Sequence, residues 1–363
     1  MSTSTESSSS GATTGKAPSS GPPAPAKGGR GKKNALSDGQ ASFAAILLSP
    51  TMVVILAVVG VPILLSIRES FFRRNDGVDP NTGLVQQGDQ FVGLGNYTSI
   101  FTDNATVSGM WGPMDRFWNA FWNTSAITLV CIILETVLGV AMALIMSKAF
   151  RGRGIVRAGI LVPWAIPTIV SALMWKLIFD ESGIANRILG RQILWLADNT
   201  SSFWAIVIAD VWKTAPFIGL LTLAGLQTIP DEVYEAARVD GANAWQQFLR
   251  ITLPMVKPAL VVAVLFRTLD TMRMFDLPYG MIGPGKYFVE TLSVFAYDEA
   301  NQTRYGPAAA YSIVLFIYIM LIAFLFVKFL GADVVGDDEV KAVREGKKRR
   351  RKMKTITSGE SAT

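Results

Sequence analysis

Several charged residues lie inside stretches of the sequence that are otherwise apolar, among them Asp210, Lys213, Arg267, Asp270 and Arg273. A charge at the centre of a bilayer costs ~2.5–3.5 kcal/mol on insertion scales, so these side chains need partners or a polar cavity. Carboxylates and basic groups can hydrogen-bond the hydroxyls of a polar solute. They can also form ion pairs that hold helices together, or relay protons. The residues alone leave these three roles open.

Covalent catalysis finds little support in this sequence. It contains no histidine, which removes imidazole bases, Ser-His and Cys-His pairs, and zinc sites built on histidine. The single cysteine, Cys131, allows no intramolecular disulfide and is expected to be a buried thiol. The sequence has no G-x-x-x-x-G-K-[ST] pattern, so ATP chemistry would have to come from another chain. We therefore expect a protein that is not an enzyme.

Three short groups of residues have helical spacing and are expected at a similar depth in the membrane. They are Trp164 and Thr168; Asp210, Lys213, Thr214 and Phe217; and Phe266, Asp270 and Arg273. Spacings of three, four and seven residues place the members of each group on one helix face. At ~1.5 Å per residue all three faces come near the middle of a bilayer. Nearby Pro163, Pro167 and Pro216 would interrupt helices there and free carbonyl groups that need polar neighbours.

The apolar stretches around these residues are long enough to cross a membrane. Of the 363 residues, 50% are hydrophobic and 17% charged, and the mean hydropathy is +0.35. This composition is unusual for a water-soluble enzyme. Helices satisfy all their backbone groups within one segment, and about 20 residues cross the hydrocarbon core. We predict an all-α integral membrane protein with six transmembrane helices at about 43–67, 120–146, 158–178, 203–226, 258–280 and 307–330.

The charge distribution predicts how the chain is oriented. We predict a disordered cytoplasmic tail over residues 1–41, the transmembrane domain over residues 42–330, and a basic cytoplasmic tail over residues 331–363. Lys and Arg number 22 in the two tails and the connections on one side, against eight on the other. Both termini are therefore expected in the cytoplasm. The net charge of +6 is then explained by membrane orientation and the lipid surface, without nucleic acid as a partner.

The connection between the fourth and fifth predicted spans, residues 227–257, is too elaborate for a simple linker. Pro230 and Asp231 supply the start of a helix. We predict a helix of roughly 231–249 outside the membrane, bent at Gly241 into two short helices, with proline ending the segment on the membrane side. Its small apolar residues would form one face and leave the charged residues for water or another protein.

The same connection carries a spaced motif: Glu235-Ala236-Ala237, three residues, Gly241, nine residues, Ile251, one residue, then Leu253-Pro254. It resembles, without a gap, the cytoplasmic signature of the binding-protein-dependent ABC importer permeases. The strings Val-Pro-Trp-Ala-Ile-Pro at 162–167 and Val-Trp-Lys-Thr-Ala-Pro-Phe at 211–217 extend the likeness. The residues of these motifs are most similar to those of the carbohydrate-uptake group, and within it to actinobacterial disaccharide permeases of the trehalose or maltose type.

The resemblance implies a function and a set of partners. The chain would sit in a bacterial cell membrane and form half of the translocation pathway for a disaccharide, working by alternating access. The implied partners are a second permease, two cytoplasmic ATPase subunits that carry ATP and Mg, and an extracytoplasmic sugar-binding protein. No cofactor is implied in this chain. The loop would be the coupling-helix pair that docks on an ATPase, through Glu235, Ala236, Ala237, Asp240 and Gly241.

The resemblance also implies a sugar pocket formed by the three helix faces described above. Its members would be Trp164, Thr168, Asp210, Lys213, Thr214, Phe217, Phe266, Asp270 and Arg273. This sequence differs from the maltose-type pattern in having acids and bases where amides and small residues are expected.

The residues leave other roles open for this charged set. Asp210 and Asp270 could pair with neighbouring bases in a purely structural network, or serve as proton relays of an ion-driven secondary transporter. A structural membrane scaffold is a third possibility. Glu135 and Arg267 are expected to support neighbouring helices rather than to contact the solute.

Overall fold

The computed structural model describes residues 35–75, 88–102 and 106–331. Most of the two predicted tails, residues 1–34 and 332–363, therefore lies outside the described residues. The chain divides into two compact units, Met1–Val61 and Pro62–Thr363. In the first unit the structure describes helix α1 (Ala35–Ile55), which a π-helical turn continues to Gly60.

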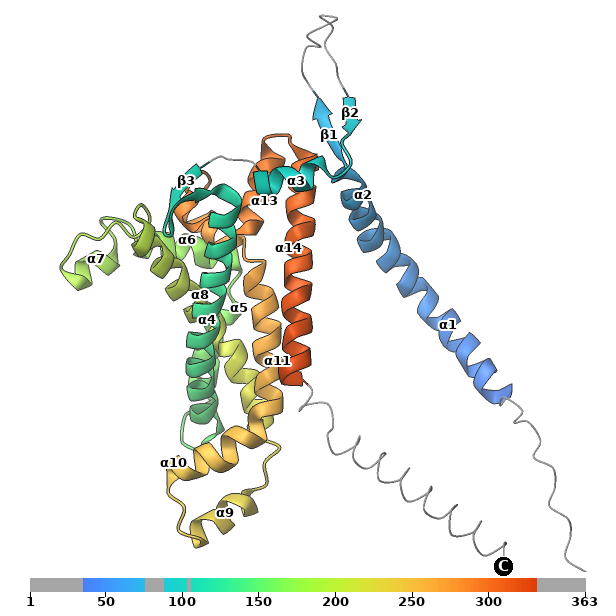
Figure 1. The fold of residues 1–363 in the computed structure, drawn as a ribbon. Helices are drawn as coiled ribbons and strands as arrows, with labels where there is room; N and C mark the ends of the chain where they lie inside the picture. The colour runs from blue at the N-terminus through green and yellow to red at the C-terminus, as the bar shows by residue number, and fades with distance from the viewer. Residues whose placement is uncertain (1–34, 76–87, 103–105, 332–363) are drawn as a thin grey trace, which may run out of the picture. The chain divides into compact units, whose positions relative to one another are not determined.

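Helices dominate the second unit, and most of its elements are labelled in Figure 1. The four longest are α4 (Arg116–Ser147), α8 (Asn199–Leu226), α11 (Leu253–Met272) and α14 (Tyr305–Phe326). Shorter helices are α2 (Val61–Glu69), α3 (Gly95–Thr102), α5 (Arg153–Ala165), α6 (Thr168–Ile178), α7 (Ile184–Leu189), α9 (Asp231–Val239), α10 (Ala244–Gln247), α12 (Asp276–Ile282) and α13 (Leu292–Asn301). Two antiparallel hairpins pair β1 (Phe72–Asn75) with β2 (Gly88–Phe91), and β3 (Thr106–Gly109) with β4 (Gly112–Asp115).

Five helical segments of the described chain are long and apolar enough to cross a membrane. They are Phe43–Glu69, Arg116–Ser147, Asn199–Leu226, Ala244–Met272 and Tyr305–Phe329. The bent pair α5 and α6 makes six if it counts as one span. The predicted all-α membrane class is confirmed, and the two short hairpins are additions that the sequence pattern did not reveal.

The third predicted span, 158–178, differs from a straight helix. α5 ends at Ala165, α6 begins at Thr168, and the two helices meet at an angle of 95°. Pro167 lies at the break, where it has no backbone N–H to donate and forces Ile166 into an extended conformation. The prediction of similar breaks at Pro163 and Pro216 was wrong, since α5 continues through the first and α8 through the second. α8 is largely buried against its neighbours, and this packing outweighs the cost of one proline.

The fifth span begins earlier than the predicted range of 258–280 and ends earlier as well. Helical structure runs without a break over Ala244–Met272, so the second loop helix, α10, continues into α11 through a π-helical turn. The expectation that proline separates loop from span was therefore wrong, because Pro254 lies in the first turn of α11, where a missing N–H costs little. The predicted bend at Gly241 is present, with φ +79° in the left-handed region that favours glycine.

Glycines let the three central helices approach one another closely. A Cβ atom at Gly139 of α4 would lie 2.8 Å from the Ile218 side chain of α8. One at Gly225 of α8 would lie 2.7 Å from the Ala259 Cβ of α11. In a bilayer the hydrophobic effect does not drive helices together, so they associate through close packing, which small residues of this kind allow. The resulting contact of α4, α8 and α11 brings their polar residues together.

An arginine at the start of α4 fixes the position of α13. Arg116 Nη2 lies 2.6 Å from Glu290 Oε1 and 2.5 Å from Asp298 Oδ2. Its guanidinium also stacks on the Phe295 ring, 4.4 Å from the ring centroid. Burial raises the pKa of the Glu290 carboxyl above its usual range, although its bonds to Arg116 act in the opposite direction. α13 is thus held to α4 by a charged cluster at one end of the bundle.

Candidate functional site

A polar pocket of about 330 Å³ lies where the break between α5 and α6 meets α8, α11 and α12. This volume falls in the range of small-molecule sites. The residues that line it are Trp164, Thr168, Asp210, Lys213, Thr214, Arg267, Asp270, Thr271, Arg273, Met274, Phe275, Asp276 and Leu277. Seven of the nine predicted pocket residues are therefore brought together, from three separate helix faces.

Arg267 links carboxylates on all three central helices. Its Nε lies 2.8 Å from Glu135 Oε2 on α4. Its Nη2 lies 2.5 Å from Asp210 Oδ2 on α8, and its Nη1 lies 2.8 Å from Asp270 Oδ2 on α11. The Arg267 side chain is only 3% exposed. The structural ion-pair network and the pocket are thus one arrangement, in which Arg267 and Glu135 support the bundle as predicted.

Glu135 anchors this network from behind the pocket. Its Oε1 accepts hydrogen bonds from Thr214 Oγ1 at 2.6 Å and from Arg267 Nη2 at 3.0 Å. Ligand atoms of Cys131, Glu135 and Asp210 lie within 4.8 Å of one another, a grouping that could suggest a metal site. The Arg267 guanidinium already bonds to both carboxylates, so the chain supplies its own cation there.

Lys213 satisfies the backbone at the helix break. Its Nζ donates to the Ile166 carbonyl at 2.7 Å and lies 3.5 Å from the Trp164 carbonyl. These are the carbonyls at the end of α5, which lack helical donors because the helix stops before Pro167. A cation at a helix C-terminus also complements the helix dipole. The prediction that freed carbonyls need a polar neighbour is confirmed here.

The open part of the pocket carries Asp270 and Arg273, whose side chains are 55% and 70% exposed. Arg273 Nη2 lies 3.2 Å from Asp270 Oδ1, while the other Asp270 oxygen faces Arg267. Asp210, in contrast, is buried beneath the pocket surface. Asp270, together with the exposed Asp276, is therefore accessible to a solute as a hydrogen-bond acceptor.

Two predicted residues lie apart from the pocket lining. Phe217 stacks on Trp164, with ring centroids 6.0 Å apart and an interplanar angle of 29°, so it supports the aromatic wall. Phe266 is 58% exposed and is absent from the lining. Thr271, which sequence analysis missed, does line it, and lies four residues after Arg267. Arg267 and Thr271 share one face of α11. A pocket predicted on that face, rather than on the face of Phe266, would have included Thr271.

The loop helices α9 and α10 carry the second predicted site. Glu235, Ala236, Asp240 and Gly241 are exposed, whereas Ala237 is buried beneath them. Glu235 and Arg238 lie 3.7 Å apart, with side chains 67% and 62% exposed. Asn243 and Gln246 cap the start of α10 through reciprocal side-chain to backbone bonds. The loop is thus internally ordered, with its charged groups directed outward.

Comparison with known proteins places these features in context. Residues 135–335 match the family described as "Binding-protein-dependent transport system inner membrane component". This stretch includes every residue that lines the pocket and the whole of the loop.

Similar curated proteins include two transport permeases. The "Trehalose/maltose transport system permease protein MalF" of Thermococcus litoralis is 41% identical over 244 residues, which cover 66% of this chain and 79% of that protein. The "Trehalose transport system permease protein SugA" of Mycobacterium tuberculosis is 37% identical over 298 residues, covering 82% and 91%.

Among solved structures, a chain of a bacterial alginate ABC transporter in complex with a pentasaccharide-bound periplasmic protein aligns with a TM-score of 0.68. The identity is 19%, and the alignment covers 84% of this chain and 99% of that one. At this identity the likeness concerns the fold.

Proposed function

The chain belongs to the family of binding-protein-dependent transport system inner membrane components, and we propose that it is a permease subunit of an ATP-driven sugar importer in a bacterial cell membrane. The proposed solute is a disaccharide of the trehalose or maltose type. The names of the similar permeases support this choice. The observation that carries it is the polar pocket at the helix break, where an open carboxylate lies beside a stacked aromatic wall.

In this proposal the pocket binds the sugar through two kinds of contact. Asp270 and Arg273 are exposed and offer an acceptor and donors to the hydroxyl groups. Trp164 presents a flat apolar face to a sugar ring, with Phe217 behind it. Asp210, Lys213 and Thr214 form the floor, and all three are already bonded within the chain.

The loop helices would dock on an ATPase subunit and drive alternating access. α10 continues into α11, so a displacement of the loop can pass along one helix to Arg267 and Asp270. These residues lie ~35–40 Å along that helix from Ala244, at ~1.5 Å per residue. A displacement passed along α10 and α11 would therefore reach the ion pairs of Arg267, which join the three central helices.

The full importer would contain several other chains. Two ATPase subunits would bind ATP and Mg, because this sequence has no phosphate-binding loop. A second, different permease would complete the pathway, and an extracytoplasmic binding protein would deliver the sugar. The excess of Lys and Arg beside the coupling loop and in the tails favours both termini in the cytoplasm.

An ion-driven secondary transporter is less well supported. Asp210, one of the two carboxylates it would use, is 5% exposed and bonded to Arg267. The ordered loop with its outward charges would have no task in such a transporter.

Purification of the native complex and reconstitution in liposomes tests the proposal. We expect two ATPase subunits and a second permease to co-purify, and trehalose or maltose to be taken up only with ATP and the binding protein. Uptake driven by a proton gradient in the absence of ATP would refute it. Uptake by liposomes that contain this chain as the only permease would refute the paired arrangement.

A further inference from the structure

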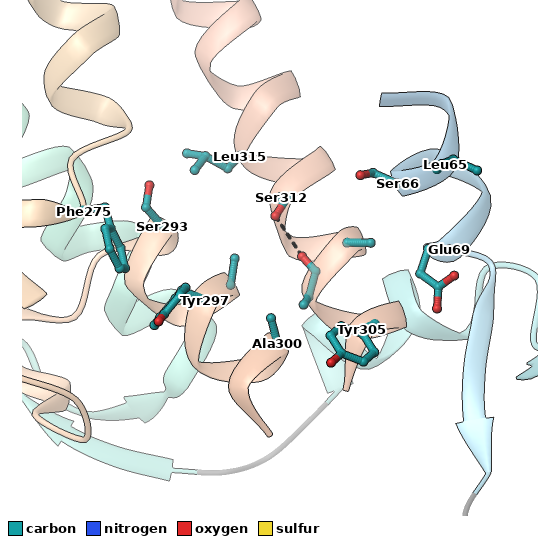
Figure 2. Close-up of a pocket in the computed structure, with 13 residues that line it drawn as sticks. Leu65, Ser66, Glu69, Phe275, Ser293, Tyr297, Ala300, Tyr305, Ser312 and Leu315 are labelled. Carbon is teal, nitrogen blue, oxygen red and sulfur yellow. Dashed lines mark hydrogen bonds between the residues drawn. The ribbon is translucent and has the colours of Figure 1, made fainter. Parts of the chain in front are cut away.

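A groove of about 770 Å³ opens beside the last turn of α2, between that turn and helices α13 and α14 (Figure 2). Its walls combine aliphatic side chains and the carboxylate of Glu69 with aromatic rings and hydroxyl groups. The rings and hydroxyls come from Phe275, Ser293, Tyr297, Tyr305 and Ser312. Tyr305 begins α14, at the end of the bundle opposite the coupling loop. In the proposed orientation this groove opens toward the outside.

The groove and the charged pocket adjoin at one residue. Phe275 lines both cavities, since it lies in the turn between the end of α11 and the start of α12. Its neighbours Met274 and Asp276 line only the charged pocket. Phe275 is therefore the lining residue that the two cavities have in common.

Phe275 is part of an aromatic triad with Tyr279 and Tyr297. The Phe275 and Tyr279 rings stack, with centroids 5.0 Å apart and an interplanar angle of 19°. Tyr297 meets them edge-on, at 4.8 Å from Phe275 and 5.2 Å from Tyr279. Tyr297 lines the groove and is 41% exposed, so the triad has an accessible face.

The triad is held in place on both sides. Asp298, the residue after Tyr297, bonds to Arg116, which fixes α13 against α4. Thr291 Oγ1 donates to the Met274 carbonyl at 2.9 Å and so anchors the turn that carries Phe275. These bonds order the rings before any solute arrives, which lowers the entropic cost of binding.

We propose that the aromatic triad is an outer sugar subsite, on which a sugar ring stacks before it enters the charged pocket. This inference rests on the proposed function and extends it. Sugar rings have apolar faces and hydroxyl edges, which match the aromatic rings of the triad and the hydroxyls of Ser293, Tyr297 and Tyr305. An acyl chain would use the rings but leave those hydroxyls unmatched.

Thiol labelling can test the subsite directly, because Cys131 is the only cysteine of the chain and is buried. Ser293→Cys places a reactive group in the groove wall, and Ser182→Cys is the control on an exposed loop. The full complex in liposomes is treated with a membrane-impermeant maleimide, with and without trehalose or maltose. We expect the sugar to slow labelling at position 293 and not at position 182.

The same labelling in a Tyr297→Leu background separates stacking from general access. We expect protection at position 293 to be lost and uptake to fall roughly tenfold, and Tyr297→Trp to retain both. Unchanged labelling with sugar present, in a complex that still shows ATP-driven uptake, would overturn the subsite and leave the proposed function standing. Absence of ATP-driven uptake in the wild-type complex would overturn both.

Discussion

The charged pocket and the loop of helices α9 and α10 both carry acids and bases, but the charges are paired and buried in the pocket and exposed to solvent on the loop. In the pocket, Arg267 and Glu135 are almost fully buried and bonded to each other at 2.8 Å. On the loop, Glu235 and Arg238 are more than 60% exposed and approach only to 3.7 Å. Exposed pairs of this kind contribute little to stability, whereas a buried charge that loses its partner is costly.

This difference separates two kinds of functional residue. Charges inside the membrane must be matched within the chain, so substitution there alters the bundle as well as any solute site. Charges on the loop are solvated and remain available for contacts with another protein. Substitution there should therefore alter assembly with that protein and leave the helix bundle unchanged. We therefore expect substitutions in the charged network to lower the stability of the permease more than substitutions on the loop.

The largest loss of stability is expected from Arg267→Gln. Without the guanidinium, Glu135 and Asp210 remain buried and unmatched, at a cost of about 3–5 kcal/mol. Thermal unfolding of the purified complex measures the loss. The double variant Arg267→Gln with Glu135→Gln removes one of the stranded charges and should recover part of it. A wild-type melting temperature for Arg267→Gln would show that the network does not hold the bundle.

A smaller loss is expected from Lys213→Met. The Ile166 carbonyl would lose its donor at the helix break, which costs about 1–3 kcal/mol for a buried unsatisfied group. Lys213→Gln keeps a donor and serves as the matched variant. Equal melting temperatures for the Met variant and the wild type would mean that other groups satisfy the break.

The loop should show almost no effect on permease stability and a strong effect on assembly. Glu235→Lys changes a side chain that is 67% exposed, so stability should stay within about 0.5 kcal/mol. We expect co-purified ATPase and sugar uptake to fall at least tenfold. Glu181→Lys, on an exposed loop elsewhere, is the control. Normal ATPase binding by Glu235→Lys would remove the coupling role from this surface.

The sequence allowed prediction of features that depend on local pattern. Apolar length indicated the spans, the spacing of Asp210, Lys213 and Thr214 indicated a shared face, and Gly241 indicated the bend in the loop. These are confirmed because length, helical period and a left-handed φ are properties of short segments.

Features that depend on packing were not predictable in the same way. Periodicity defines the faces of α11 but not which of them turns inward, so Phe266 was placed in the pocket while Thr271 was missed. Proline signals a possible break, yet Pro167 breaks its helix and Pro216 does not, because α8 is buried on several sides. α11 ends at Met272, eight residues before the end of the predicted span, and in the turn that follows the Thr291 hydroxyl bonds to the Met274 carbonyl, a contact that hydropathy does not reveal.

The central claim is that the open carboxylate Asp270 binds sugar while the buried Arg267 holds the bundle. The most direct test is ATP-driven sugar uptake by the Asp270→Asn complex, measured beside its thermal unfolding and that of Arg267→Gln. A lost hydrogen bond to a charged group is worth ~1.5–3 kcal/mol, so uptake should fall about tenfold or more while the complex melts close to wild type. If Asp270→Asn instead destabilises the complex and the surviving protein transports normally, the role of Asp270 is confined to its ion pair with Arg267 and the sugar binds elsewhere.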